Sequence, residues 1–248
     1  MLLAKNKMTD KQKRLLVIPG EVIAEGDELL PGEGTSKENG KIVAKIYGLS
    51  EINESLVRVI PVSGAYLPRR GNVIIGEVVG VTGNGWLIDV GAADNAFLSI
   101  MEVPRYVDKN ALREVFNIGD SLLAKIWSIG GRGMDLSVKM RGFGKLHEGI
   151  IFAVNPNKIP RIIGKEGSMI NLIKDKTGCN ISVGQNGQVW IKGQTIGAEV
   201  FAKNAITFID DNSQKSGLTE EVTNWFDENT PADLPKKEEK EEEVEEQQ

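Results

Sequence analysis

The loop Gly164-Lys165-Glu166-Gly167 has the residue types and spacing that suit contact with a phosphate backbone. A glycine at each end removes the side chains that would hold such a backbone away, and glycine tolerates positive φ. Lys165 can pair with a phosphate, whereas the carboxylate of Glu166 repels one. Apolar residues precede and follow the loop at helical spacing. Because a Gly-x-x-Gly loop between two helices can hold the backbone of about four nucleotides, this loop is a candidate nucleic-acid clamp.

Basic residues in the middle of the chain form a second candidate site. A guanidinium group suits phosphate because its planar fork donates two parallel hydrogen bonds. Arg105, Lys109 and Arg113 are spaced four apart, and they would form one stripe if a helix extended back past Pro104. Each residue alone could equally be a solvated surface residue. As a set they predict an electrostatic track for nucleic acid, with the members Arg69, Arg70, Arg105, Lys109, Arg113 and Arg132.

The net charge of −5 looks unsuited to nucleic acid, but the charge is unevenly distributed. From Glu220 to Gln248 there are 12 acidic residues and 3 lysines, a net charge of −9. The other 219 residues carry 27 basic and 23 acidic groups, a net charge of +4. The acidity therefore lies near the C-terminus, and the rest of the chain is mildly basic, which permits nucleic-acid binding without proving it.

Several classes of function lack the residues they need. A single histidine, His147, and a single cysteine, Cys179, exclude a His/Cys metal centre and an internal disulfide. There is no P-loop, dinucleotide fingerprint or Gly-x-Ser-x-Gly element. We therefore expect no catalytic residue, metal or cofactor, although a nuclease stays an alternative because carboxylate pairs leave no sequence signature. The absence of an apolar run of roughly 18 residues and of a signal peptide predicts a cytoplasmic protein without a membrane partner.

The first 65 residues divide into an arm and a small domain. Residues 1–14 are polar and lysine-rich, and they are predicted to be a mobile basic arm. Strand-like runs at 15–23, 42–48 and 56–62, separated by glycine-rich turns, predict a β-sandwich over residues 15–65. From Leu15 to Gly64 there are 8 acidic and 4 basic residues, so this domain is expected to dock onto a partner rather than hold RNA.

Residues 66–145 have the element order of a five-stranded OB barrel, with a helix expected at 108–116 between the third and fourth strands. The strand-like runs are 73–81, 85–91, 96–100, 121–129 and 134–138. The fragments 76–80, 87–91, 118–120 and 134–139 resemble the S-one-like RNA-binding OB domain. Leu87 and Ser99 stand where that family often has an aromatic residue and a histidine. RNA binding is therefore expected to depend more on charge than on base stacking.

Residues 146–212 predict a domain with the order strand, helix, helix, strand, strand, helix. Its elements are expected at 149–154, 157–163, 168–177, 179–183, 188–192 and 196–209. This order, with the Gly-x-x-Gly loop between the first two helices, is that of a type I KH domain. Its clamp would consist of Arg161, Gly164, Lys165 and Gly167. The alternative is a domain that only packs against its neighbour. Trp190 is expected in its core.

Residues 213–248 are predicted to be an acidic, disordered tail, because the charged run 236–246 has too little apolar area to offset chain entropy. Leu218 to Phe226 could form a short helix with Leu218, Val222, Trp225 and Phe226 on one side. That helix would be either a docking peptide or an element packed on the KH domain.

Taken together, residues 15–212 resemble the archaeal exosome RNA-binding cap subunits that carry an S-one-like domain followed by a KH domain. Segments 17–21, 161–170 and 183–187 also carry the resemblance. It implies a non-catalytic, trimeric cap, alone or mixed with the zinc-ribbon cap subunit, on a hexameric ring of phosphorolytic exosome subunits. The cap would capture single-stranded RNA and pass its 3′ end through the pore. The alternative is a free-standing RNA-binding factor in translation or transcription.

Overall fold

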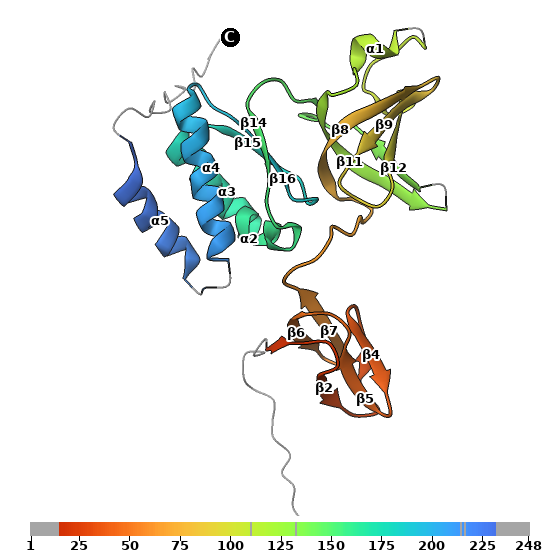
Figure 1. Ribbon diagram of the computed structural model, residues 1–248, viewed down its shortest axis with the longest axis vertical. Coiled ribbons are helices and arrows are strands. Elements are labelled where there is room, and N and C mark those ends of the chain that lie inside the picture. Colours follow the sequence, from red (N-terminus) through yellow and green to blue (C-terminus); the bar gives the residue numbers. More distant parts are fainter. Residues whose placement is uncertain (1–14, 110, 132, 214, 216, 232–248) are drawn as a thin grey trace, which may run out of the picture. The chain divides into compact units, whose positions relative to one another are not determined.

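The computed structural model describes residues 15–231 except residues 110, 132, 214 and 216 (Figure 1). The chain divides into two compact units, Met1–Gly64 and Ala65–Gln248, which are considered one at a time. The predicted basic arm, Arg132 and the end of the predicted acidic tail lie outside the described residues. No helix in the described part of the chain is long and apolar enough to cross a membrane.

The N-terminal unit is a small β-sandwich, which confirms the predicted fold of this part. One sheet has the strand order β1-β6-β7-β3 and the other has the order β2-β5-β4. Val17 and Val59 of the first sheet pack against Ala44 and Ile23 of the second. The strands are β1 Leu16–Val17, β2 Val22–Glu25, β3 Leu30–Pro31, β4 Thr35–Glu38, β5 Lys41–Ala44, β6 Gly48–Asn53 and β7 Leu56–Pro61.

The strand expected at 42–48 is divided, because the chain passes from one sheet to the other between β5 and β6. A Cβ at Gly48 would lie 2.2 Å from the carbonyl oxygen of Ile60, so only glycine fits where β6 starts. The sequence pattern missed β6 because two of its buried residues are polar. Ser50 Oγ donates to the carbonyl of Leu15, and Glu51 accepts from Arg58 Nε at 2.6 Å.

The second unit begins with a closed five-stranded barrel, as the OB prediction requires. The order β12-β10-β9-β8-β11 is completed by pairing of β11 with β12, and β10 runs parallel to β12. Trp86 is fully buried inside, and its indole nitrogen donates to the carbonyl of Phe116 at 3.0 Å. The strands are β8 Val73–Thr82, β9 Gly85–Asp89, β10 Ala96–Ser99, β11 Ser121–Gly130 and β12 Gly133–Ser137, and a short β13, Gly144–Lys145, pairs antiparallel with the start of β11.

The helix expected at 108–116 is much shorter than predicted. It is the single turn α1, Leu112–Val115, and a 3₁₀ turn η1, Ile100–Glu102, precedes it. Ala111 at the N-cap makes no side-chain capping bond, so nothing extends α1 toward Pro104. The intervening segment is held by burial of Val107 in the barrel core instead.

The KH domain follows with the predicted order of elements. Its antiparallel sheet has the order β14-β16-β15, and its helices cover one face (Figure 1). Ile162 and Ile173 from the helices pack with Val189 and Ile191 from β16. The elements are β14 Ile150–Ala153, η2 Pro156–Lys158, α2 Ile159–Ile163, η3 Lys165–Gly167, α3 Ser168–Thr177, β15 Asn180–Val183, β16 Gln188–Lys192 and α4 Ile196–Asp211.

The start of the predicted disordered tail is an ordered helix, α5, Leu218–Asn229. It packs against α4 (Figure 1), so of the two possibilities for this helix the structure has the packed one. Val222 and Phe226 are fully buried, and the Trp225 ring stacks on Phe201 and Phe208 at 5.3 and 5.7 Å. The tail prediction failed here because apolar residues at helical spacing outweigh the acidic composition of the segment.

The barrel and the KH domain are joined by hydrogen bonds between β8 and the turn that links β15 to β16. The turn between β15 and β16 lies along the first half of β8, before the pairing of β8 with β9 starts at Glu77. The backbone of Gln185 donates to the carbonyl of Val73, and the Gln185 side chain accepts from the Val73 amide. Asn186, only 7% exposed, bonds the amide and carbonyl of Ile75 and the carbonyl of Val90.

Candidate nucleic-acid interface

The Gly-x-x-Gly loop links α2 to α3, and three of its four residues have positive φ. Gly164 ends α2 with φ 75°, and a Cβ there would lie 2.7 Å from the amide nitrogen of Met169. Glu166 has φ 54°, and Gly167 has φ 81° as it starts α3. Both glycines are therefore required to turn the chain so tightly, and the loop presents backbone rather than bulk.

The charges at this loop are of mixed sign. Arg161, Lys165 and Glu166 are all exposed. Within the described part of the chain neither Arg161 nor Lys165 forms an ion pair. The two cations are thus free to meet phosphate, while the carboxylate of Glu166 stands between the two glycines and opposes it.

The barrel has two kinds of cation. Lys139 and Lys145 are held by Glu102 and Asp120 at 3.0 and 2.6 Å. In contrast, four members of the predicted track are exposed and form no ion pair with any other described residue: Arg70, Arg105, Lys109 and Arg113. A cation without a carboxylate partner loses no attraction when a phosphate approaches, so these four are better suited to RNA than the paired lysines.

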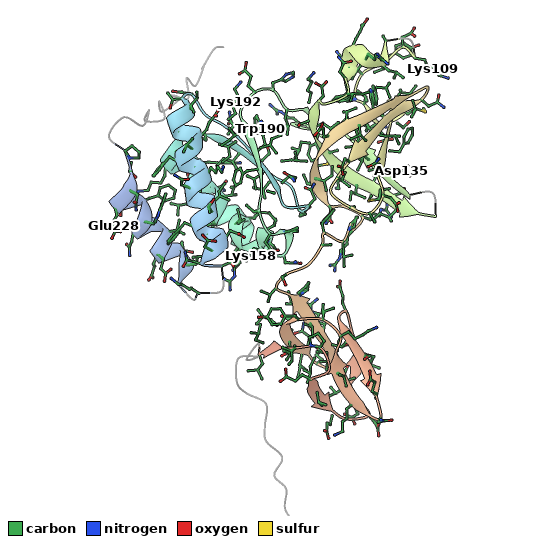
Figure 2. All side chains as sticks on the ribbon, viewed as in Figure 1. Lys109, Asp135, Lys158, Trp190, Lys192 and Glu228 are labelled. Carbon is green, nitrogen blue, oxygen red and sulfur yellow. The ribbon has the colours of Figure 1, made fainter. Side chains whose placement is uncertain are left out.

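The predicted helical stripe is wrong, although its members remain on the surface. Arg105 lies in a bend and Lys109 in a turn, and only Arg113 belongs to α1. Figure 2 labels Lys109 beside α1 at one end of the barrel. Arg105 and Lys109 therefore lie on an irregular segment, held in place by buried Val107 rather than by helical geometry. Arg69 is exposed, and Arg132 is not described.

The outer face of the barrel carries an aromatic residue that the sequence reasoning did not single out. Phe97 on β10 is the cross-strand neighbour of Leu87 on β9 and of Asp135 on β12. Its side chain is half-buried, as is that of Leu87, because the alternate residues of both strands fill the core. Alternation around the buried Leu98 would have placed Phe97 on this face.

A second missed aromatic, Trp127, lies on β11. The pairing of β11 with β12 shifts register between Ile126 and Ser128, so Trp127 is the extra residue of a β-bulge. Its side chain is 56% exposed, and the Arg70 guanidinium carbon lies 5.6 Å from the ring centroid. An exposed indole under a guanidinium is a cation–π pair.

Trp190 is not in the KH core, contrary to prediction. Val189 and Ile191 point into the core, so Trp190 faces the other side of the sheet, opposite Ile151 on β14. Its indole nitrogen donates to the carbonyl of Glu148 at 2.8 Å. In Figure 2 Trp190 and Lys192 lie close together on the KH sheet.

Burial shifts the pKa values of two side chains that could take part in chemistry, Cys179 and Tyr66. Burial raises the pKa of the Cys179 thiol, which keeps it protonated and unsuited to nucleophilic attack. Burial likewise raises the pKa of Tyr66 to about 12, so its hydroxyl stays protonated and donates to Asn72 Oδ1 at 2.9 Å. Within the described residues no group of three or more His, Cys, Asp or Glu side chains could hold a metal ion.

The Tyr66 shift predicts a pH dependence of stability. Because its folded pKa lies above the unfolded value of about 10, the folded state holds the proton more tightly. The free energy of unfolding should be unaffected by this group below about pH 10 and should fall as the pH rises toward 12. Urea titrations of the wild type and Tyr66→Phe across this range measure the difference. A parallel decline in both proteins would contradict this role.

The fold and the candidate site together define a class of protein. Its members combine a β-sandwich, an OB barrel and a KH domain, with a Gly-x-x-Gly loop and exposed cations that a phosphate can reach. Two family models match, the Exosome RNA binding protein RRP4 N-terminal domain over residues 14–63 and the KH domain over residues 149–208.

Comparison with individual proteins narrows this class. An exosome complex component Rrp4 from Methanobrevibacter smithii is 41% identical over 93% of this chain and 77% of its own. One from Thermococcus kodakarensis is 40% identical over 86% of this chain and 85% of its own length. A crystal structure described as a candidate exosome complex RNA-binding protein has TM-score 0.60 and 29% identity over 66% of this chain and 97% of its own. The chain belongs to the Rrp4 family of exosome complex components.

Proposed function

We propose that this chain is a non-catalytic, RNA-binding cap of an archaeal-type exosome. It captures single-stranded RNA and feeds the 3′ end through the pore of a phosphorolytic ring. The observation that carries the proposal is the combination, in a Rrp4 family member, of a Gly-x-x-Gly loop and barrel cations without carboxylate partners. We place the protein in the cytoplasm, without a cofactor, as a trimeric cap alone or mixed with the zinc-ribbon cap subunit.

The proposed division of labour assigns one task to each part of the chain. Residues 15–65 dock on the ring, residues 66–145 line the path of the RNA, and residues 146–212 hold its backbone from the side. The track consists of Arg69, Arg70, Arg105, Lys109, Arg113 and Arg132. The clamp consists of Arg161, Gly164, Lys165 and Gly167.

Reconstitution with the ring subunits tests this function. The ring with the cap should degrade long single-stranded RNA faster than the ring alone, with the gain lost at high salt because capture is electrostatic. Affinity purification of the tagged chain from its host should bring ring subunits with it. Recovery of ribosomes without ring subunits would support a free-standing translation factor instead.

The absence of catalysis is tested on the purified chain alone. Labelled RNA incubated with the chain, phosphate and divalent cations should remain intact, and the same RNA should be degraded once ring subunits are added. Degradation by the chain alone that persists through further purification would contradict a non-catalytic role.

The N-terminal unit offers a specific edge for docking. In the sheet β1-β6-β7-β3, the edge strand β1 exposes Leu16, and Ile18 immediately after it is also exposed. An edge strand with exposed apolar side chains is a template for association. Leu16→Asp should weaken assembly with the ring by about tenfold or more, measured by analytical ultracentrifugation.

The opposite edge supplies the control for this docking prediction. Leu56 is also exposed, and it neighbours Leu30 on β3. Leu56→Asp introduces the same charge and should leave assembly unchanged. Equal losses in both variants, or a loss in Leu56→Asp alone, would show that β1 is not the docking edge.

The KH loop yields a separate prediction. Glu166→Gln removes the carboxylate between the two glycines with little change of shape, so RNA binding should tighten by about twofold to fivefold at low salt and converge with the wild type at high salt. Fluorescence anisotropy with a labelled oligoribonucleotide measures this. Glu220→Gln on α5 removes the same charge far along the chain and should have no effect. An unchanged affinity in Glu166→Gln would indicate that RNA does not reach the loop.

A further inference from the structure

Trp127 is the one exposed tryptophan among the four of the chain, all of which the structure describes. Trp86 is buried and bonded to a carbonyl, Trp190 is bonded to the carbonyl of Glu148, and Trp225 stacks between α4 and α5. The indole nitrogen of Trp127 bonds to no described residue. A large aromatic that is 56% exposed and absent from the barrel core contributes little to folding, so its position calls for another explanation.

The backbone around Trp127 holds its side chain outward. The bulge at Trp127 lies between two residues that keep their pairing with β12, Ile126 with Leu136 and Ser128 with Asp135. Ser128 Oγ also donates to Asp135 Oδ2 at 2.6 Å. The strand is therefore fixed on both sides of the bulge, and the indole is presented to solvent by a rigid element.

The turn that carries Arg70 is also fixed by hydrogen bonds, and it holds Arg70 over the Trp127 ring. The amide of Gly71 donates to the carbonyl of Ile126, and the amide of Ile126 donates to the carbonyl of Asn72, both at 2.8 Å. Asn72 Oδ1 accepts from the Arg69 amide and from the buried hydroxyl of Tyr66. The turn thus places the Arg70 guanidinium 5.6 Å from the Trp127 ring before any ligand binds.

We infer that Trp127 and Arg70 form a binding site for one nucleotide of single-stranded RNA, in which the base stacks on Trp127 and Arg70 binds the adjoining phosphate. Every base has a flat π-face, so stacking tolerates any sequence. The guanidinium of Arg70 forms no ion pair with any described residue, and its planar fork can bind a phosphate while it remains near the ring. The proposed site does not include Leu87 or Ser99, the two positions at which the S-one-like family often has an aromatic residue and a histidine.

The inference rests on the proposed function, and it adds to that function a contact that is not purely electrostatic. A track made only of charges would hold RNA with an affinity that disappears at high salt. A stacked base retains affinity when the phosphate contacts are screened, because the π-contact carries no net charge. The site would therefore retain part of its affinity for RNA at salt concentrations that abolish binding to the charged track.

The test measures binding of a 12-nucleotide oligoadenylate and of an abasic ribose-phosphate oligomer of equal length to the full chain. Variants are Trp127→Ala, Trp127→Leu, Trp127→Phe and Arg70→Gln, with affinities taken by anisotropy at several salt concentrations. Trp127→Ala and Trp127→Leu should lose about tenfold in affinity for oligoadenylate, with no change in salt slope and no change for the abasic oligomer. Trp127→Phe should retain most of the affinity, and Arg70→Gln should reduce the salt slope for both ligands.

Fluorescence provides an independent readout. Oligoadenylate should quench part of the wild-type tryptophan emission, and Trp127→Phe should abolish that part. Far-UV circular dichroism and thermal unfolding establish that each variant is folded, which is expected because Trp127 is outside the core.

The outcomes separate this inference from the function on which it rests. Wild-type binding of oligoadenylate that is unchanged in Trp127→Ala would overturn the nucleotide site and leave the cap proposal standing. Failure of the wild type to bind either oligomer would overturn both. Unchanged RNA affinity together with lost ring assembly in Trp127→Leu would identify the site as a protein contact and would overturn the inference.

Discussion

Asn186→Ala should separate the KH domain from the barrel and lower the melting temperature of the second unit by about 6–12 °C. Asn186 bonds the amide of Ile75 at 3.2 Å and the carbonyls of Ile75 and Val90 at 2.7 and 3.0 Å. Its removal leaves these three buried groups without partners, and each unpaired group costs about 1–3 kcal/mol. A total loss of about 3 kcal/mol corresponds to that shift in a domain of this size.

The effect is expected to be large because no other strand pairs with the first part of β8 on the side where Asn186 lies. Pairing of β8 with β9 starts at Glu77, so the first part of β8 has the turn 184–186 as its neighbour on that side. Without the turn, β8 would expose an unpaired edge, which is an unfavourable arrangement in a sheet. The two domains should then unfold in separate transitions rather than in one.

Differential scanning calorimetry and limited proteolysis of the full chain measure this uncoupling. Gly184→Ala should disrupt the same contact sterically, since a Cβ at residue 184 would lie 2.8 Å from the amide nitrogen of Ile75. Asn180→Ala, at an exposed position on β15, is the matched control and should leave the melting temperature unchanged. A single transition at the wild-type temperature in Asn186→Ala would mean that water replaces the lost bonds.

Neutralising the unpaired cations of the barrel should produce the largest loss of RNA affinity. In a chain with Arg105, Lys109 and Arg113 all changed to glutamine, affinity for single-stranded RNA should fall by about tenfold to a hundredfold at low salt. Each phosphate contact on a single strand contributes about 0.7 to the slope of log K against log salt. The slope should therefore become shallower by about 2 if all three cations contact phosphate.

Paired lysines provide a control with the same change of net charge. Lys139, Lys145 and Lys176 are bound to Glu102, Asp120 and Asp227 at 3.0, 2.6 and 3.2 Å. Changing these three to glutamine should alter affinity and salt slope far less, because their charges are already compensated. Equal losses in both triple variants would show that RNA responds to overall charge, and would refute a track at the exposed cations.

Much of the fold follows from local pattern. α3 at Ser168–Thr177 and β16 at Gln188–Lys192 have the bounds that apolar spacing and the flanking glycines predict. The barrel and the KH domain were predictable because their cores are apolar and their element orders are distinctive. β6 was missed because buried Glu51, a polar residue that interrupts the apolar pattern, is paired with Arg58, its cross-strand neighbour on β7.

The residue types of the candidate site could be predicted from the sequence better than their arrangement in space. The clamp residues lie at the predicted helix–helix junction, because glycine there is a local requirement of the backbone. The stripe of Arg105, Lys109 and Arg113 was wrong, because tertiary burial of Val107 holds that segment in an irregular path. Trp190 and Trp127 were misplaced or overlooked because the face of a strand residue depends on register and on bulges.

The sequence by itself determined which chemistry is available: a Gly-x-x-Gly loop for a phosphate backbone, basic residues for capture, and one histidine and one cysteine, which exclude a His/Cys metal centre and an internal disulfide. It also determined the order of the domains, since periodicity and turn residues act locally. Only the tertiary structure decided which cations lack carboxylate partners, how Asn186 joins two domains, and that Trp127 meets Arg70 at a bulge. These depend on contacts between residues far apart in the chain, and local residue preferences carry no information about such contacts.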